Sequence, residues 1–237
     1  MRPAERDKLL LLLAITSGSA DSWSFLGLGN AFVANMTGNT VLLGLGVTGQ
    51  HDLIHPLIAL GAYVVGVTIG TILTRRVTAD SLWHRAVSRV LLIETLLLVI
   101  ATAGWIATGD APHSLDKGRL LACLGIAIGL QSGAMLALKL PGIVTTYVTG
   151  TWTMLISGLT LLGRPSSQRT PPDKTAFEER LVLQVVFLVC YFLAAVVAGF
   201  TLRNAPQLIG ALCLLPTLTV AIYSLWIDIE AKTKRAT

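Results

Sequence analysis

Long apolar runs separated by short polar segments dominate the pattern of this 237-residue chain. A helix that crosses a bilayer needs about 20 mostly apolar residues. Six runs reach that length: 9–29, 54–74, 90–109, 120–140, 181–202 and 207–227. Two further apolar runs, 40–49 and 152–163, are too short to cross alone. The pattern predicts an all-α polytopic membrane protein with six full transmembrane helices.

Each short run follows a polar stretch that contains Thr-Gly. The first stretch is Phe32-Val-Ala-Asn-Met-Thr-Gly-Asn39, and the second is Val144-Thr-Thr-Tyr-Val-Thr-Gly-Thr151. Asn or Thr before a helix can cap it, because the side-chain oxygen accepts a free backbone N–H of the first turn. Helices that begin at polar residues inside a membrane are typical of transporters. We therefore expect two re-entrant or broken segments, with polar loops at the membrane surface as the alternative.

The order of these elements repeats along the chain. A span, a Thr-Gly segment and two more spans occur in 9–109 and again in 120–227, within one membrane domain that covers 1–237. Three full spans in the first half make the second half enter the membrane in the opposite sense. Such 3+3 inverted repeats place a solute site near the bilayer midplane, between the halves.

The basic residues distinguish this topology from one with eight crossings. Six spans place fourteen of the eighteen Lys and Arg residues on one side, whereas eight crossings move the arginines at 75–89 to the other side. Cytoplasmic loops carry an excess of Lys and Arg, so we expect six spans and two cytoplasmic termini. The N-terminus resembles a signal peptide, but its apolar run continues beyond Ala20, which favours a retained first span.

The composition excludes a soluble protein and gives no sign of catalysis. Charged residues make up 13% of the chain and the mean hydropathy is +0.71, whereas soluble domains have about a quarter charged residues. The net charge of +5 comes from basic residues at the ends of the runs, so it does not indicate a nucleic-acid partner. The three cysteines lack metal-ligand spacing, and phosphate-binding and hydrolase motifs are missing. We expect no enzymatic activity, cofactor or metal.

Two acidic residues lie inside the apolar runs. Asp21 either faces a cavity, a partner or a transported ion, as costly membrane carboxylates do, or caps a broken helix, or lies near enough to the outer surface to be hydrated. Glu94 lies five residues from Arg89, so we expect it to reach the interface or to pair there.

We expect the two Thr-Gly segments to face each other across a pseudo-two-fold axis, so that the positive ends of two half-helices point at one polar site. Such a site suits an anion or a solute with carbonyl or carboxylate oxygens, and Asp21 nearby leaves the charge of the solute open. The predicted binding residues are Asp21, Asn35, Thr37, Gly38, Asn39, Gln131, Ser132, Thr146, Tyr147, Thr149, Gly150 and Thr151.

Several of these stretches resemble the signature stretches of the YoaK family: Gly18-Ser-Ala-Asp-Ser22, Gly129-Leu-Gln-Ser-Gly133 and both Thr-Gly segments. The resemblance covers nearly the whole chain and implies a multi-pass protein of the bacterial inner membrane. It supplies no activity, because the family has no assigned function. The residues themselves favour a secondary transporter or channel for a small solute, with a non-transporting scaffold or assembly partner as the alternative. Besides the lipid bilayer and this solute, a homo-oligomeric partner is left open.

Overall fold

The chain is helical in the part that the structure, a computed structural model, describes: residues 3–76, 83–109, 113–138, 148–162 and 171–236. Six of the helices described there are long and apolar enough to cross a membrane, which confirms the predicted fold class. A short 3-10 helix, η1 (Pro206–Leu208), leads into the last helix. In chain order the α-helices are α1 (Pro3–Gly27), α2 (Met36–Val47), α3 (Ile54–Thr74), α4 (Arg85–Thr108), α5 (Ser114–Leu136), α6 (Val148–Leu162), α7 (Pro171–Asn204) and α8 (Ile209–Ala236).

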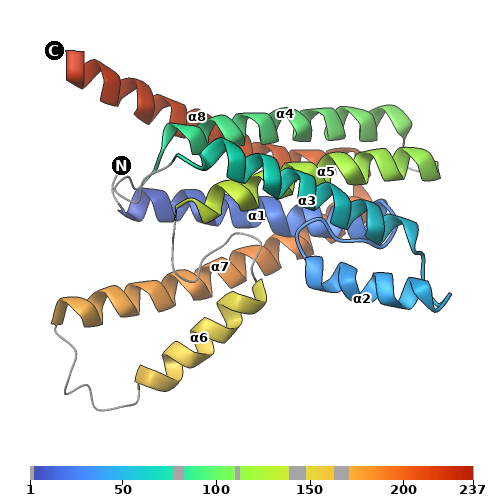
Figure 1. Ribbon diagram of the computed structural model, residues 1–237, viewed down its shortest axis with the longest axis horizontal. Coiled ribbons are helices and arrows are strands. Elements are labelled where there is room, and N and C mark those ends of the chain that lie inside the picture. Colours follow the sequence, from blue (N-terminus) through green and yellow to red (C-terminus); the bar gives the residue numbers. More distant parts are fainter. Residues whose placement is uncertain (1–2, 77–82, 110–112, 139–147, 163–170, 237) are drawn as a thin grey trace.

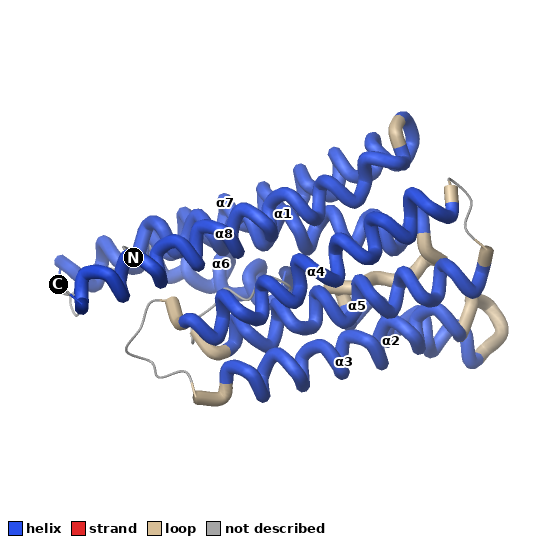
Figure 2. The backbone as a smooth tube through the Cα atoms, turned by 90° about the horizontal axis from the view of Figure 1, so that it is seen from above, coloured by secondary structure: helices blue, strands red, loops and turns tan. Residues whose placement is uncertain are grey.

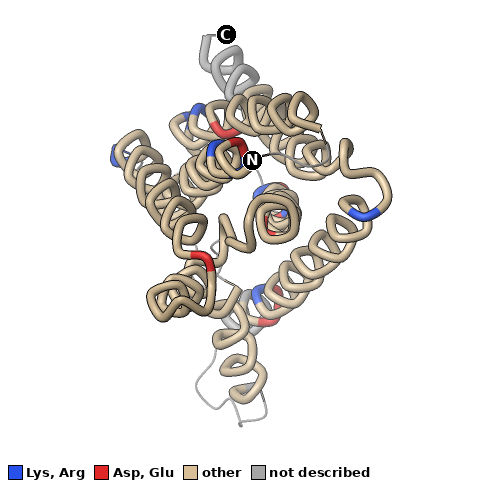
Figure 3. The backbone as a smooth tube through the Cα atoms, turned by 90° about the vertical axis from the view of Figure 1, so that its right-hand side faces the viewer, with Lys and Arg blue, Asp and Glu red and all other residues tan. Residues whose placement is uncertain are grey.

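The long helices follow the predicted apolar runs and often extend beyond them. α3 has the bounds of its run, whereas α4 and α7 begin well before the apolar residues do. Polar residues can extend a membrane helix past the hydrocarbon region, because Glu, Lys and Arg are good helix formers. Seen along the long axis of the molecule, few positions of the helices carry charge (Figure 3).

The two short helices both begin near the middle of the molecule. α2 has 12 residues and α6 has 15, so their lengths are about 18 and 22 Å at the helical rise, less than the roughly 30 Å of a bilayer core. Figure 1 shows α2 and α6 running outward from the middle toward opposite ends of the bundle. Their N-termini therefore lie in the interior and their C-termini lie toward the two membrane surfaces.

The first Thr-Gly segment re-enters the bundle and returns to the side it came from. After α1 ends, the loop 28–35 folds back until the backbone N–H groups of residues 33–35 reach the carboxylate of Asp21. α2 then runs outward again, and the start of α3 lies against the turn after α1: a Cβ on Gly29 would come within 2.6 Å of the His55 ring. α2 therefore adds no crossing, which contradicts the eight-crossing alternative for this segment.

The packing of the helices repeats in the two halves of the chain. α3 packs on α5 as α7 packs on α1, and α2 packs on α3 as α6 packs on α7. Likewise α4 contacts α5 where α8 contacts α1, and α4 and α8 contact each other. Figure 2 shows α2–α5 together on one side and α1 with α6–α8 on the other. Exchanging the two halves leaves this set of contacts unchanged, which is what a two-fold relation between 9–109 and 120–227 requires.

Glycines bring the central helices unusually close. A Cβ on Gly66 of α3 would lie 2.3 Å from the carbonyl oxygen of Ile126, and one on Gly129 of α5 would lie 2.5 Å from the carbonyl oxygen of Tyr63. The equivalent contact between α1 and α7 is made by Gly18, whose added Cβ would lie 2.5 Å from the Tyr191 carbonyl oxygen. Apolar burial does not drive helices together in lipid, so close backbone packing takes its place.

Candidate functional site

Asp21 ties the loop before α2 to the first membrane helix. This side chain of α1 is only 5% exposed. Its Oδ1 accepts the backbone N–H groups of Val33 at 2.9 Å, Ala34 at 2.6 Å and Asn35 at 3.4 Å. Hydrogen bonds to a carboxylate are roughly twice as strong as neutral ones. Asp21 therefore does what the capping alternative predicted, except that the N–H groups belong to the loop and not to the first turn of α2.

The second carboxylate oxygen of Asp21 connects α1 to α7. It accepts a hydrogen bond from the Tyr191 hydroxyl, with an O–O distance of 2.5 Å. The hydroxyl of the next residue, Ser22, donates to the carbonyl oxygen of Ala195, one turn after Tyr191 in α7. A buried charge in a membrane is tolerated where partners of this kind surround it. Asp21 is thus enclosed and does not line the cavity described below, whereas its partners Ala34, Asn35 and Tyr191 do.

Two asparagines shape the start of α2. Asn35 is the N-cap, as predicted for an Asn or Thr here: its side-chain oxygen accepts the N–H of Gly38 at 3.1 Å. Asn39 is fully buried; its side chain accepts the N–H of Phe32 at 2.8 Å and donates to the Phe32 carbonyl at 2.6 Å. The Phe32 ring in turn stacks on Phe25 of α1. These contacts fix the position from which α2 begins.

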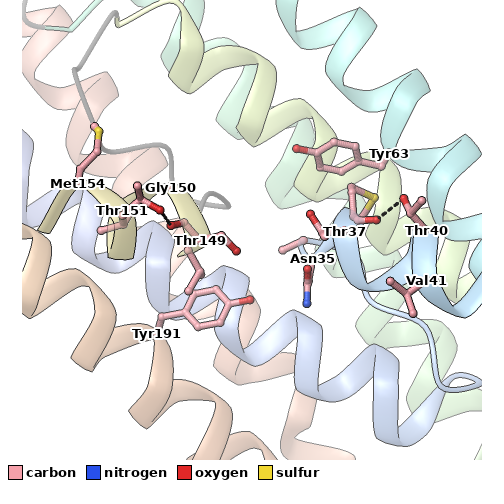
Figure 4. Close-up of a pocket in the computed structure, with 14 residues that line it drawn as sticks. Asn35, Thr37, Thr40, Val41, Tyr63, Thr149, Gly150, Thr151, Met154 and Tyr191 are labelled. Atoms are coloured by element: carbon pink, nitrogen blue, oxygen red, sulfur yellow. Dashed lines mark hydrogen bonds between the residues drawn. The ribbon is translucent and has the colours of Figure 1, made fainter. Parts of the chain in front are cut away.

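A cavity of about 1060 Å³ separates the start of α2 from the start of α6. Figure 4 shows Asn35 and Thr37 on one side of it, and Thr149 and Tyr191 on the other. None of the lining residues that the structure describes carries a formal charge. They are Ala34, Asn35, Met36, Thr37, Thr40, Val41, Tyr63, Val148, Thr149, Gly150, Thr151, Thr153, Met154 and Tyr191.

Five of the predicted binding residues line this cavity: Asn35, Thr37, Thr149, Gly150 and Thr151. Asp21, Gly38 and Asn39 do not line it. Asn39 turns toward Phe32, and an added Cβ on Gly38 would meet the Phe32 ring at 3.0 Å. The predicted binding residues Thr146 and Tyr147 lie outside the described residues.

The structure places the predicted binding residues Gln131 and Ser132 elsewhere. The Gln131 amide of α5 donates to the Ser17 hydroxyl of α1 at 3.0 Å, and the Ser132 hydroxyl donates to the Ile128 carbonyl of its own helix at 2.9 Å. Neither lines the cavity. Neither residue therefore has the predicted role of a solute ligand. Gln131 makes a contact between helices, and Ser132 makes a hydrogen bond within its own helix.

The prediction for Glu94 was also wrong. Glu94 is 0% exposed in the middle of α4, whereas Arg89 is exposed. Five residues along a helix turn the side chain by well over a right angle, so the two side chains leave α4 in different directions. Glu94 does not reach the interface.

Two aromatic residues that line the cavity, Tyr63 and Tyr191, are not among the predicted binding residues. Each lies inside a long apolar run, where a Tyr is easily taken for a packing residue. A buried Tyr hydroxyl usually needs a hydrogen-bond partner, which is the signal that could have singled out Tyr191.

The cavity combines hydrogen-bonding groups with apolar surface. Threonine hydroxyls, the Asn35 side chain and two tyrosines supply hydrogen-bonding groups, and Met36, Val41 and Met154 supply apolar surface. The N-terminal ends of α2 and α6 add the positive ends of two helix dipoles. The carboxyl group of Asp21 lies behind this wall, hydrogen-bonded to the loop and to Tyr191.

Six helices long and apolar enough to cross a membrane define a multi-pass α-helical membrane protein. The chain belongs to the family described as "Protein of unknown function (DUF1275)", whose model matches residues 9–225. It is 32% identical over 198 residues to the UPF0700 transmembrane protein YoaK of Bacillus subtilis (strain 168), an alignment that covers 83% of this chain and 84% of that protein. No solved structure matches. The predicted resemblance to the YoaK family is thereby confirmed.

Proposed function

We propose that this protein is a secondary transporter of a small polar solute and that the solute binds in the cavity between α2 and α6. The observation that carries the proposal is the shared lining: Asn35 and Thr37 from one half of the chain, Thr149 and Thr151 from the other. Irregular backbone at membrane depth is tolerated where it is buried in protein or lines a water-filled cavity. Here the loop before α2 is held at the depth of Asp21 and opens onto such a cavity.

The lining supports a particular class of solute. The described lining residues offer hydrogen bonds and two helix N-termini, but no full charge. A solute rich in carbonyl or hydroxyl oxygens fits that environment, because helix N-termini favour electron-rich atoms. A solute with a strong positive charge would meet two positive dipole ends without an exposed carboxylate to offset them.

The distribution of basic residues supports an orientation in a bacterial inner membrane. Figure 1 shows the start of α1, the end of α3, the start of α4 and the end of α8 at one end of the molecule. Most of the Lys and Arg residues lie in these segments and in 164–180. Under the positive-inside rule this end faces the cytoplasm, so both termini are cytoplasmic in this proposal.

The proposal can be tested before any substrate is known, by thiol labelling from each side of the membrane. In a background with the three native cysteines replaced by alanine, we expect T37C and T149C to react with a membrane-impermeant maleimide both in intact cells and in inverted vesicles. Alternating access exposes a midplane site to each side in turn, and the Thr37 and Thr149 side chains are already exposed in the cavity.

Two variants at the ends of the bundle calibrate this assay. R85C at the start of α4 should react only in inverted vesicles, and D116C at the start of α5 should react only in intact cells. If T37C and T149C react from one side alone, or from neither, the site does not alternate and the protein is better described as a non-transporting scaffold.

A further inference from the structure

A second buried carboxyl group lies away from the cavity and has no hydrogen-bond partner. Glu94 is 0% exposed, and neither of its carboxylate oxygens is hydrogen-bonded within the described part of the chain. It lies nine residues into α4, about 14 Å along the helix axis at the usual rise. With Arg85 near the membrane surface, this depth is close to the middle of the hydrocarbon core.

An ionised carboxylate at such a place would be very costly. Moving an isolated carboxylate into an apolar medium costs far more than burying a neutral polar group, and such a group avoids the cost by taking up a proton. No ion pair with a described Lys or Arg offsets the charge of Glu94. We propose that Glu94 is a proton-binding site and that the proton is the coupling ion of the transport cycle. The coupling role rests on the proposed function, but the bound proton does not.

The groups that face Glu94 cannot take over the role of a counter-ion. From α8, which packs on α4, Cys213 is buried in the same apolar cluster as Leu98, one turn beyond Glu94 on α4. From α5, the thiol of Cys123 donates to the carbonyl oxygen of Leu97, one turn beyond Glu94 on α4. The other carboxyl group that is buried in the described helices belongs to Asp21 of α1, a helix that packs on α8. The two thiols and the second acid supply no positive charge to stabilise an ionised Glu94. The neutral, protonated form of Glu94 is therefore favoured.

Beside Cys213, a series of polar groups connects the surroundings of Glu94 to the solute cavity. Next to Cys213, the Thr16 and Thr217 hydroxyls hydrogen-bond at 2.8 Å across the α1–α8 contact, and both oxygens lie within hydrogen-bond distance of the Cys213 carbonyl, to which the hydroxyl that accepts in this pair can donate. Asp21 lies just over one turn from Thr16 on α1 and binds Tyr191, which lines the cavity. In a low-dielectric interior, the negative charge left when Glu94 loses its proton would change the electrostatic potential at Asp21. Asp21 in turn holds the loop before α2.

Infrared spectroscopy of the purified protein tests the bound proton directly. The difference spectrum between wild type and Glu94→Gln at about pH 7 should show the C=O stretching band of one carboxylic acid, and this band should shift in heavy water. Asp21→Asn should leave this band in place. A difference spectrum that shows ionised-carboxylate bands in its place would overturn the proposal. This measurement does not depend on reagent access, and Glu94→Gln replaces a neutral acid with an amide of similar size.

The thiol-labelling assay and the infrared band together separate this inference from the proposed function. If the carboxylic-acid band is present but T37C and T149C are not accessible from both sides, the proton site stands and the coupling role fails. If accessibility alternates but Glu94 is ionised, the transporter proposal stands and this inference falls. If both hold, Glu94→Gln should leave T37C and T149C reactive and remove any pH dependence of their labelling rates beyond that of the exposed D116C thiol, because maleimide reacts with the thiolate.

Discussion

Replacing Asp21 by alanine is expected to destabilise the protein severely, while replacement by asparagine is expected to have a smaller effect. Alanine removes the acceptor of three loop N–H groups and of the Tyr191 hydroxyl. Each buried donor left unpaired costs about 1–3 kcal/mol, so the loss should reach several kcal/mol. Asparagine keeps an oxygen for the loop, and its NH₂ group can donate to the Tyr191 oxygen. We expect it to cost about 1–2 kcal/mol, the loss of the charge on these hydrogen bonds.

Thermal unfolding of the purified variants in detergent measures this difference. Tyr191→Phe removes only the bond to Oδ2 and should rank near Asp21→Asn, and Asp116→Ala, at the surface end of α5, should match wild type. An Asp21→Ala protein that is as stable as wild type would show that the carboxylate does not hold the loop. In that case the ion-binding interpretation of Asp21 would regain support.

The second large effect is expected from filling the cavity across its width. Thr37→Trp places a large ring opposite Thr149. We expect this ring to lower the maleimide labelling rate of T149C by about tenfold or more, because a group that fills a pocket covers most of the pocket's walls. The Thr37 side chain is exposed in the cavity and does not pack in a core, so stability should change little. Labelling of T149C is the measurement, from both sides of the membrane.

The matched control for cavity filling is Val47→Trp. Val47 is at the far end of the same helix and is 76% exposed, so the added ring has the same chemistry but no access to the cavity. T149C should label at its normal rate in this control. Equal labelling rates in both variants would mean that Thr37 and Thr149 do not share one cavity.

Much of the helix arrangement could be predicted from the sequence, because membrane helices must satisfy their own backbone and therefore appear as apolar runs of fixed length. The short helices could be predicted for a different reason. A Thr-Gly stretch with Asn35 before an apolar run contains a capping signal. The repeated order of elements also pointed to the two halves, although only the packing of α3 on α5 and of α1 on α7 shows how they interlock.

The roles of single polar residues were harder to predict, because they depend on contacts between distant parts of the chain. Asp21 and Tyr191 are 170 positions apart, and Gln131 and Ser17 are 114 apart. No local pattern indicates which of these side chains meets another and which faces a cavity. Glu94 shows the same difficulty: its distance from Arg89 in sequence suggested a pair, but the direction of its side chain is set by the packing of α4.

Cross-linking of T37C to T149C tests the central claim most directly. With a protease site inserted between α4 and α5, a short bismaleimide should keep the two fragments of most molecules joined after cleavage, because both residues line one cavity. The pair V47C and T149C, which places one thiol at the outer end of α2, should separate into two fragments. If the T37C and T149C protein also separates, the two half-helices do not meet, and the transporter proposal loses its site.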